Sequence, residues 1–346
     1  MDIYQNDGWL DIGRLNSLPA NFYIIIGSRQ VGKTYSCFKH IMDTYVKNDI
    51  PFIFMRRTGP ELLGCLSDNP FDKGYNPDHG TAYKFDKIKG IRPDSRLNIV
   101  DGLNENKIIG SAFSLSGLVS NRGFNGDPYQ CIMYDEFIPE KIKKRMNGEK
   151  EAFENAYMTI NSVRELKGRP AVKAWLLSNS NSIESPILEA FGLVNTITRM
   201  QNRGQEFCFL PEQKICVVNV AESKISEQLA QTALFKAVQD QQFRGMALHN
   251  TFAYDDFSCI GTEPINEYRL LVTIGTLNIY EHKSHDLYYV TMHRRGTGKS
   301  FPDNLSGRHR FLQNYIWLQD KVIAERVTFE NYELKLKLFE YLKIKG

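Results

Sequence analysis

The chain has no long hydrophobic segment. Apolar runs such as Phe22–Ile26 and Ala174–Leu177 are far shorter than the roughly 18 consecutive apolar residues of a membrane-spanning helix. The residues from Met1 to Ala20 are polar and mixed in charge, which is not the pattern of a signal peptide. We therefore expect no membrane span, and a chain that stays in the cytosol.

Cysteine is scarce, and neither sign of charge dominates. Six cysteines are scattered without a CxxC pair, which favours reduced thiols and argues against a structural zinc site. Forty-three Lys and Arg residues face forty Asp and Glu residues, and this balance of +3 neither requires nor excludes nucleic-acid binding. Whether the chain binds nucleic acid therefore depends on local clusters of charge.

What is present is the composition of an ordinary globular protein, 42% apolar and 24% charged. A length of 346 residues predicts about two domains. Over the first 200 residues, short β-rich runs alternate with helical periodicity, which predicts an α/β fold with a largely parallel sheet covered on both faces. The expected buried strands are Phe22–Ile26, Pro51–Met55, Cys131–Tyr134 and Ala174–Leu177, the last of which ends the series.

The pattern changes beyond residue 200. A Gln- and Ala-rich helical stretch, Ile225–Phe243, suits a linker, and a β-rich pair, Arg269–Ile279 and Leu287–Met292, precedes two helical runs. We predict an α/β domain, a helical linker subdomain and a small α+β domain, over residues 1–200, 201–260 and 261–346.

Residues 27–34 match the phosphate-binding loop pattern G-x-x-x-x-G-K-[ST]. The loop follows a predicted strand and opens an amphipathic helix, so its main-chain N–H groups and the positive helix end can surround a polyphosphate. Lys33 is expected to pair with the β- and γ-phosphates, and the Thr34 hydroxyl to ligate Mg²⁺. The residues expected to bind ATP are Gly27, Ser28, Arg29, Gln30, Val31, Gly32, Lys33 and Thr34.

A second signal is the apolar strand Cys131–Tyr134, which ends in Asp135 and Glu136. An isolated acid pair is common at a solvated strand end. Beside a phosphate-binding loop, it predicts that Asp135 holds the magnesium ion and that Glu136 orients and deprotonates the attacking water. Because a Glu next to this Asp is typical of a hydrolase that supplies its own base, we expect turnover of ATP.

Three further residues complete the expected catalytic set. Asn179 follows the strand Ala174–Leu177 and is expected to face the γ-phosphate, with a turn-capping Asn as the alternative. Arg164 and Arg169 are expected to project near a subunit edge, where one of them would face the transferred phosphoryl group of the same or a neighbouring subunit. Arg164 is the first choice, and a solvated charge at a helix end is the alternative.

Four motifs occur in order: GSRQVGKT, FIFMRRTGPELL, CIMYDEFIPEK and WLLSNS. Over residues 20–195 they make the chain resemble the DNA-packaging ATPases of small podoviruses whose genomes carry a terminal protein. These are relatives of terminase large subunits and of additional-strand P-loop translocases. The resemblance implies an additional-strand, RecA-like ATPase sheet in the first domain, with ATP and Mg²⁺ as its ligands.

The resemblance also implies partners. It predicts a homomeric ring, expected to be a pentamer, in the host cytoplasm and transiently on the portal protein of a procapsid, where it drives double-stranded DNA inward. In some members a structural packaging RNA takes part. One departure concerns Thr58-Gly59, where family members can carry a basic residue, so any role of that residue passes to Arg56 or Arg57 or is absent.

DNA of any sequence can be gripped through its phosphates by cations on a loop. One candidate is Ser120–Gly126 with Arg122, where terminase relatives carry a basic loop. The other is Lys141–Arg145, with Lys143 and Lys144. A solvated charged surface is the alternative for both.

The C-terminal domain is expected, by the same resemblance, to be a ribonuclease-H-like nuclease that has lost its metal-binding acids. The strand Leu270–Ile279 contains no Asp or Glu, so we expect no DNA cleavage. The segment His293–Ser300 ends in Gly-Lys-Ser but fails the phosphate-loop spacing, and it is interpreted as a basic loop. Asp255, Asp256 and Asp286 are interpreted as turn residues. His282 and His285 flank a turn, with a metal role as the alternative.

Two other functions remain open. One is a terminase large subunit that also cuts DNA, which cleavage in the presence of Mg²⁺ or Mn²⁺ would indicate. The other is an adaptor or structural protein that binds ATP without significant turnover, which intact nucleotide after long incubation with DNA and portal protein would indicate.

Overall fold

The computed structural model describes residues 3–6, 8–27, 32–120, 124–139, 148–162, 164–179, 182–183, 185–220, 231–237 and 257–344. The chain divides into two compact units. Unit 1 contains Met1–Leu193 and Arg199–Asp255, and unit 2 contains Val194–Thr198 and Asp256–Gly346. Each helix in the described ranges is too short or too polar to cross a bilayer.

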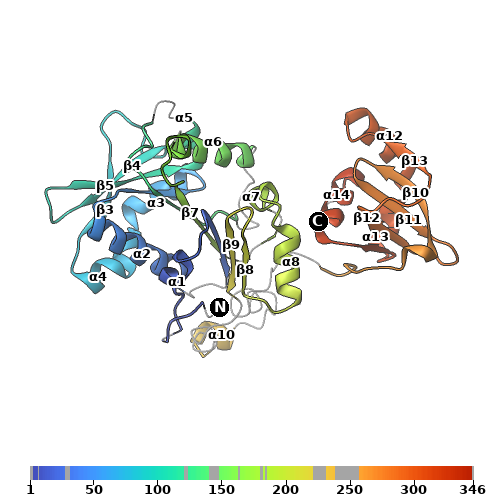
Figure 1. Cartoon of the computed structure of the whole chain (residues 1–346), viewed down its shortest axis with the longest axis horizontal. Coiled ribbons are helices and arrows are strands. Elements are labelled where there is room, and N and C mark those ends of the chain that lie inside the picture. The colour runs from blue at the N-terminus through green and yellow to red at the C-terminus, as the bar shows by residue number, and fades with distance from the viewer. Residues whose placement is uncertain are drawn as a thin grey trace. The chain divides into compact units, whose positions relative to one another are not determined.

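A twisted, mostly parallel sheet forms unit 1 (Figure 1). Its strands are β1 (Phe22–Gly27), β2 (Phe52–Arg56), β3 (Tyr83–Lys87), β4 (Arg96–Asp101), β5 (Lys107–Ser114), β6 (Cys131–Asp135), β7 (Lys173–Asn179), β8 (Phe207–Leu210) and β9 (Ile215–Val220). Within the described residues their order is β3-β4-β5-β2-β6-β7-β1-β9-β8. The predicted α/β class is confirmed, and β4 and β5 pair with each other in antiparallel orientation.

Strand β7 lies between β1 and β6 and pairs in parallel with both. This is the additional strand that the resemblance predicts between the phosphate-loop strand and the acid-bearing strand. Strand β2 continues the parallel series beyond β6. Because these four strands point the same way, their carboxyl ends meet at one edge of the sheet, where open α/β sheets bind ligands.

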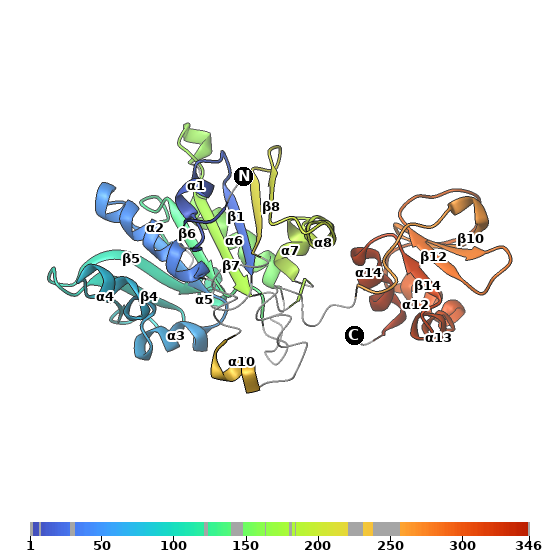
Figure 2. The same ribbon diagram turned by 90° about the horizontal axis from the view of Figure 1, so that it is seen from below.

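Helices cover both faces of the sheet. Helix α2 (Lys33–Asn48) lies on one face and buries Phe38, Ile41 and Met42 against it. On the other face, Phe153 of α6 (Glu149–Asn161) stacks on Tyr134 of β6. Figure 1 and Figure 2 show these two helices on opposite sides of the strands. The other helices of this part of the chain are α1 (Ile12–Asn16), α3 (Gly59–Ser67), η1 (Pro70–Lys73), α4 (Tyr75–His79), α5 (Leu115–Ser120), η2 (Glu165–Lys167), α7 (Pro186–Ala190), α8 (Val194–Asn202) and α10 (Ala233–Ala237).

The boundary predicted at residue 200 is wrong, because the sheet does not end at β7. All six residues of β9 are buried, and β9 pairs in parallel with β1, while β8 closes the edge as its antiparallel partner. The run Ile215–Val220 is short and flanked by polar residues, so it lacks the context of a core strand in the sequence. Of the predicted helix Ile225–Phe243, the structure describes α10 and otherwise leaves the stretch outside the described residues.

Unit 2 has the predicted α+β composition. The sheet order is β13-β10-β11-β12-β14, and the elements are η3 (Ile265–Glu267), β10 (Tyr268–Ile274), β11 (Leu277–His282), β12 (Tyr288–Thr291), β13 (Lys299–Phe301), α12 (Leu305–Tyr315), α13 (Leu318–Ile323), β14 (Val327–Phe329) and α14 (Tyr332–Leu342). The predicted single strand Arg269–Ile279 is wrong. It is a hairpin, because Gly275 adopts a φ of 54° and reverses the chain between β10 and β11.

An ion pair lies in the core of unit 1. Arg57 Nε, one residue beyond β2, donates to Glu149 Oε1 at 2.8 Å, and both side chains are 1% exposed. We expect Glu149→Gln to lower the free energy of unfolding by about 3–5 kcal/mol, because Glu149 would no longer offset the burial of the Arg57 charge. Urea denaturation of the full chain, followed by tryptophan fluorescence, measures this change.

The matched control is the exposed pair Lys39–Asp43 within α2. Lys39→Ala should cost less than about 1 kcal/mol, because water screens exposed ion pairs. Equal losses in the two variants would show that the Arg57–Glu149 pair does not stabilise the core.

Candidate functional site

The described residues of the phosphate loop lie at the end of β1 and at the start of α2. Gly27 ends β1, and Gly32 precedes α2 with a φ of 78°, a conformation that favours glycine. The Lys33 ammonium, 6% exposed as a residue, donates to the Gly27 carbonyl at 3.1 Å and to Asn179 Oδ1 at 3.2 Å. Lys33 therefore spans the mouth of the loop. The predicted phosphate ligands that lie outside the described residues are Ser28, Arg29, Gln30 and Val31.

The acid pair lies beside this loop. The Thr34 hydroxyl donates to Asp135 Oδ1 at 3.2 Å, and Asp135 is 4% exposed. Glu136, the next residue, adopts a φ of 58°, and its side chain is 45% exposed. A left-handed conformation is unusual for a residue other than glycine, and the surrounding structure has to hold it in place.

Backbone bonds to β7 hold the turn that carries Glu136. The Phe137 N–H donates to the Leu177 carbonyl at 3.2 Å, and the Ile138 N–H donates to Ser178 Oγ at 3.2 Å. In the register of β1 and β7, Gly27 is the partner of Asn179. The structure thus brings Asn179, at the carboxyl end of a parallel strand, beside Gly27 of the phosphate loop.

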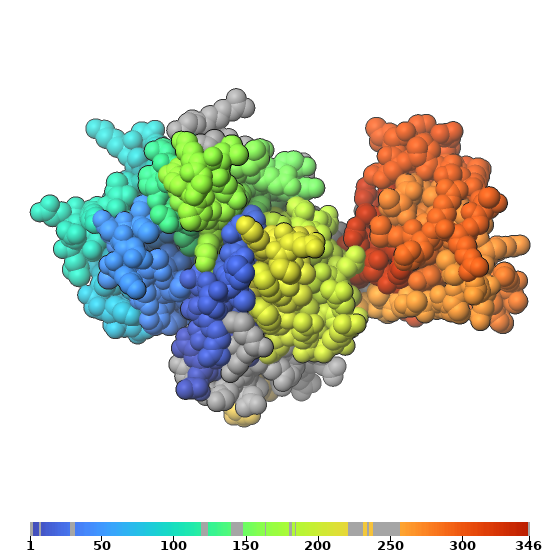
Figure 3. Space-filling model, viewed as in Figure 1, coloured from blue at the N-terminus to red at the C-terminus, as the bar shows by residue number. Residues whose placement is uncertain are grey.

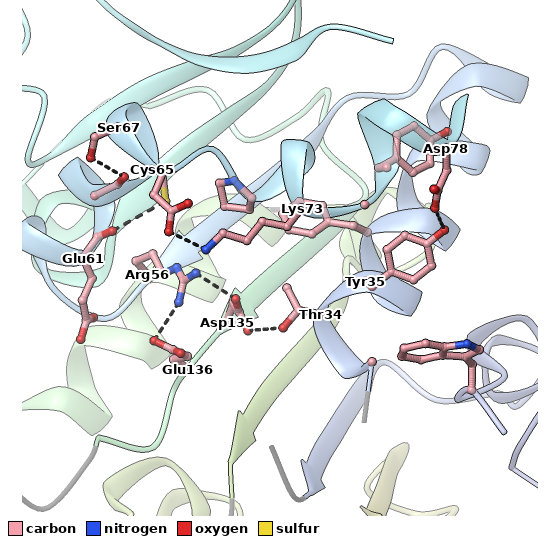
Figure 4. Close-up of a pocket in the computed structure, with 18 residues that line it drawn as sticks. Thr34, Tyr35, Arg56, Glu61, Cys65, Ser67, Lys73, Asp78, Asp135 and Glu136 are labelled. Carbon is pink, nitrogen blue, oxygen red and sulfur yellow. Dashed lines mark hydrogen bonds and ion pairs between the residues drawn. The ribbon is translucent and has the colours of Figure 1, made fainter. Parts of the chain in front are cut away.

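Arg56 at the end of β2 bridges the two acids (Figure 4). Its Nη2 lies 3.1 Å from Asp135 Oδ2, and its Nη1 lies 2.9 Å from Glu136 Oε2. Burial alone would lower the pKa of Arg56, but the two carboxylates outweigh that effect and raise it above the usual range for arginine. The Arg56 guanidinium therefore offsets part of the negative charge of the acid pair within the subunit.

From the sequence, Arg56 is only one of two alternatives, with Arg57, for the role of a basic residue at Thr58-Gly59. Thr58 instead caps the N-terminus of α3, in a capping box with Glu61. The parallel register places Met55 beside Tyr134, so the following residues, Arg56 and Asp135, become neighbours. Only this pairing of strands that are distant in the sequence identifies Arg56 as part of the site.

The two candidate arginines for action between subunits differ in their environment. Arg164 was expected to project at a subunit edge, which is wrong: it is 4% exposed, and its guanidinium donates to the carbonyls of Pro170 and Asp127. These bonds make it an internal brace for the segment before β7. The side chain of Arg169 is 37% exposed and pairs with the Asp127 carboxylate at the surface. Of the two, Arg169 is the accessible cation.

The candidate DNA-binding residues Arg122, Lys143 and Lys144 lie outside the described residues, and so do Asp255 and Asp256. The structure does describe Phe124, which lies within the first candidate loop. The guanidinium of Arg96 lies 4.8 Å from the Phe124 ring centroid and 5.3 Å from that of Phe113. This cation–π contact packs Phe124 against β4 and β5.

In unit 2, the described residues at the predicted turn form hydrogen bonds within that unit. His282 Nδ1 accepts the N–H groups of Ser284 and His285, and Asp286 accepts from Lys321 at 2.8 Å. The predicted basic loop is bonded to Tyr280 of β11, whose hydroxyl accepts the Arg295 N–H at 2.6 Å. These contacts agree with the interpretation of this region as turns and a basic loop.

The arrangement suits a magnesium nucleotide. A cavity of about 1040 Å³ extends from Arg56, Asp135 and Glu136 past Thr34, and a hollow of about 170 Å³ adjoins Lys33 and Asn179. Its size is that of a small-molecule site. The oxygens of Thr34 and Asp135 are the donor type that Mg²⁺ prefers, and the Lys33 ammonium complements a phosphate.

The comparisons with known proteins agree with this geometry. Residues 12–300, more than half of the chain, match the family "Podovirus DNA encapsidation protein (Gp16)". A DNA packaging protein of Bacillus phage B103 is 29% identical over 235 residues, which cover 67% of this chain and 64% of that protein, just under two thirds of its length. The DNA packaging protein of Bacillus phage PZA is 24% identical over 302 residues, covering 84% of this chain and 82% of that protein.

A solved structure shares the fold over the whole chain. A chain of "The bacteriophage Phi-29 viral genome packaging motor assembly" superposes with a TM-score of 0.67 at 17% identity, covering 99% of this chain and 100% of that one. The phosphate loop, the additional strand and the match over residues 12–300 lead to one conclusion: the chain belongs to the podovirus DNA encapsidation protein family.

Proposed function

We propose that the chain is the ATP-hydrolysing subunit of a viral genome-packaging motor that moves double-stranded DNA into a procapsid. One observation carries the proposal: Lys33, Thr34, Asp135 and Glu136 meet at one edge of the sheet, beside a cavity that suits a nucleotide. Membership in the DNA encapsidation family and the relatives described as DNA packaging proteins support the coupling to DNA.

Each residue has a role that follows from its position. Lys33 holds the β- and γ-phosphates, Thr34 and Asp135 hold Mg²⁺, and Asn179 contacts the γ-phosphate beside Lys33. When bound, Mg²⁺ neutralises charge on the phosphate oxygens. Glu136 orients the attacking water and accepts its proton, for which its ion pair with Arg56 has to open.

The assembly is a homomeric ring, with five subunits as the expected number, in the host cytoplasm and transiently at the portal vertex. The partners are the portal protein, double-stranded DNA and, as an option, a structural packaging RNA. The fold shared with a chain of the Phi-29 motor assembly supports such a ring. Arg122, Lys143 and Lys144 contact DNA phosphates, and unit 2 does not cut DNA.

The proposal is tested first by the chemistry of ATP. We expect Lys33→Ala to abolish nucleotide binding, because the cation at the loop mouth is lost. Glu136→Gln should keep ATP binding but slow hydrolysis about 10²- to 10⁴-fold, because an amide cannot accept the proton. Phosphate release in the presence of DNA and portal protein, together with nucleotide titration, measures both.

Hydrolysis at the wild-type rate in Glu136→Gln would contradict the role of that residue. Intact ATP in the wild-type assembly would instead identify a nucleotide-binding adaptor. DNA cleavage with Mg²⁺ or Mn²⁺ would identify a nuclease-competent terminase. Lys39→Ala, on the exposed side of α2, is the control that should keep full activity.

Arg169 is expected to act on the nucleotide of a neighbouring subunit. Arg169→Ala subunits keep a complete phosphate loop, whereas Lys33→Ala subunits keep Arg169, so a mixed ring can combine the two in adjacent subunits. We expect such mixtures to hydrolyse ATP faster than either variant alone. Phosphate release measured across mixing ratios checks this.

Asp127→Asn is the matched control, because it frees Arg169 from its surface partner and should leave ATP hydrolysis intact. A mixture that never exceeds its separate components would assign Arg169 to a surface ion pair only.

Arg56 is expected to compete with a metal ion for the acid pair. We predict that Arg56→Gln binds Mn²⁺ about tenfold or more tightly without nucleotide, because a positive charge in contact with both carboxylates is removed. Electron paramagnetic resonance of free Mn²⁺ measures the affinity. Lys39→Gln is the control for an overall change in charge, and an unchanged affinity in Arg56→Gln would show that the guanidinium does not compete.

A further inference from the structure

Trp9 lies directly on the last glycine of the phosphate loop. A Cβ atom on Gly32 would overlap Cε3 and Cζ3 of the Trp9 ring. The absence of a side chain at Gly32, together with its φ of 78°, thus lets an indole ring cover the loop at this point. Trp9 and Thr34 line the same cavity, which also holds Asp135.

The turn that presents Trp9 is fixed by its backbone. Tyr4 and Leu10 form a β-bridge, the Gln5 N–H donates to the Trp9 carbonyl at 2.7 Å, and the Gly8 N–H donates to the Gln5 carbonyl at 2.9 Å. Leu10, next to Trp9, is buried in the core of unit 1. Part of the N-terminal segment, in blue, is visible on the face of unit 1 that Figure 3 shows. Trp9 is therefore held at the cavity by a built turn.

A second aromatic ring stands beside Trp9. The centroid of the Tyr35 ring lies 6.2 Å from that of Trp9, and the two planes are tilted by 52°. The Tyr35 hydroxyl donates to Asp78 Oδ2 at 2.5 Å, and the ring lies over Gly74, where a Cβ would come within 2.6 Å of it. Tyr35 is thus anchored at its hydroxyl and along the ring.

The direction of a bound nucleotide follows from the two ends of the cavity. Figure 4 shows Asp135, Glu136 and Arg56 on one side of Thr34, and Tyr35 with Asp78 on the other. If the terminal phosphate lies at the acid pair, the nucleoside has to leave toward Tyr35 and Trp9. Flat aromatic faces are the groups on which nucleobases stack.

We propose that Trp9, with Tyr35 beside it, is the stacking platform for the base of a purine nucleoside triphosphate. This inference rests on the proposed ATPase function, and it adds a base-binding subsite formed by residues outside the phosphate-loop motif. Its chemistry is contact with the face of the base, so it acts on the nucleoside and leaves the triphosphate contacts to Lys33 and Thr34.

Two probes separate the base from the phosphates: ATP and inorganic tripolyphosphate, each titrated with Mg²⁺ into the full chain. We expect Trp9→Leu to weaken ATP binding about tenfold and to leave tripolyphosphate binding unchanged, because one base–aromatic stack is lost. Trp9→Phe keeps a ring and should stay within about threefold of the wild type for both probes. Isothermal titration calorimetry measures the affinities.

Tryptophan fluorescence provides a second measurement, in a variant that keeps Trp9. Trp175 is buried against Tyr23, so replacing Trp317 of unit 2 by Phe leaves Trp9 as the accessible tryptophan of the chain. In Trp317→Phe, ATP should quench the tryptophan fluorescence, and tripolyphosphate should not.

Three results would overturn the proposal. An equal loss of ATP and tripolyphosphate binding in Trp9→Leu would show that Trp9 only supports the phosphate loop. Unchanged ATP affinity in Trp9→Leu, or equal quenching by both probes, would show that the base lies elsewhere. A wild-type chain that binds neither probe would contradict the ATPase function itself, an outcome distinct from the other two.

Discussion

The parallel alignment of β2, β6, β7 and β1 is the constraint on which the rest of unit 1 depends. It takes four segments that are distant in the sequence and brings Arg56, Asp135, Asn179 and Gly27 to one edge. The strands are buried on both faces, so a shift of register by one residue would move every side chain to the opposite face. The packing of the core thus sets the positions of the polar groups at the strand ends.

Charges at this edge are balanced inside the subunit. Asp135 and Glu136 share the Arg56 guanidinium, and the Lys33 ammonium is held by the Gly27 carbonyl and Asn179. A magnesium nucleotide brings both a cation for the acids and phosphates for the cations. Under the proposed function, binding of this ligand would replace internal pairs by pairs with the ligand, which would limit the net cost of desolvating these buried charges.

The two arginines at the end of β2 serve different parts of unit 1. Successive side chains leave an extended chain on opposite sides, so Arg56 reaches the acid pair while Arg57 enters the core and pairs with Glu149. Glu149 begins α6, which stacks on Tyr134 of the acid-bearing strand. The adjacent residues Arg56 and Arg57 thereby connect the edge of the sheet that carries the acid pair to helix α6 on the opposite face.

Much of this could be predicted from the sequence alone, because some signals are local. The phosphate-loop motif, the acids that end an apolar run and the helical spacing of Phe38, Ile41 and Met42 each occupy a short stretch, and so the sequence by itself determined the fold class and the main nucleotide-site candidates.

Only the tertiary structure decided what depends on pairing between distant residues. It placed β9 inside the sheet and paired Arg56 with the two acids. It also showed that Arg164 is buried with its guanidinium bonded to backbone carbonyls, and that Trp9 contacts Gly32. No periodic pattern or motif in the sequence indicates these contacts, because strand order and side-chain burial are properties of the folded chain as a whole.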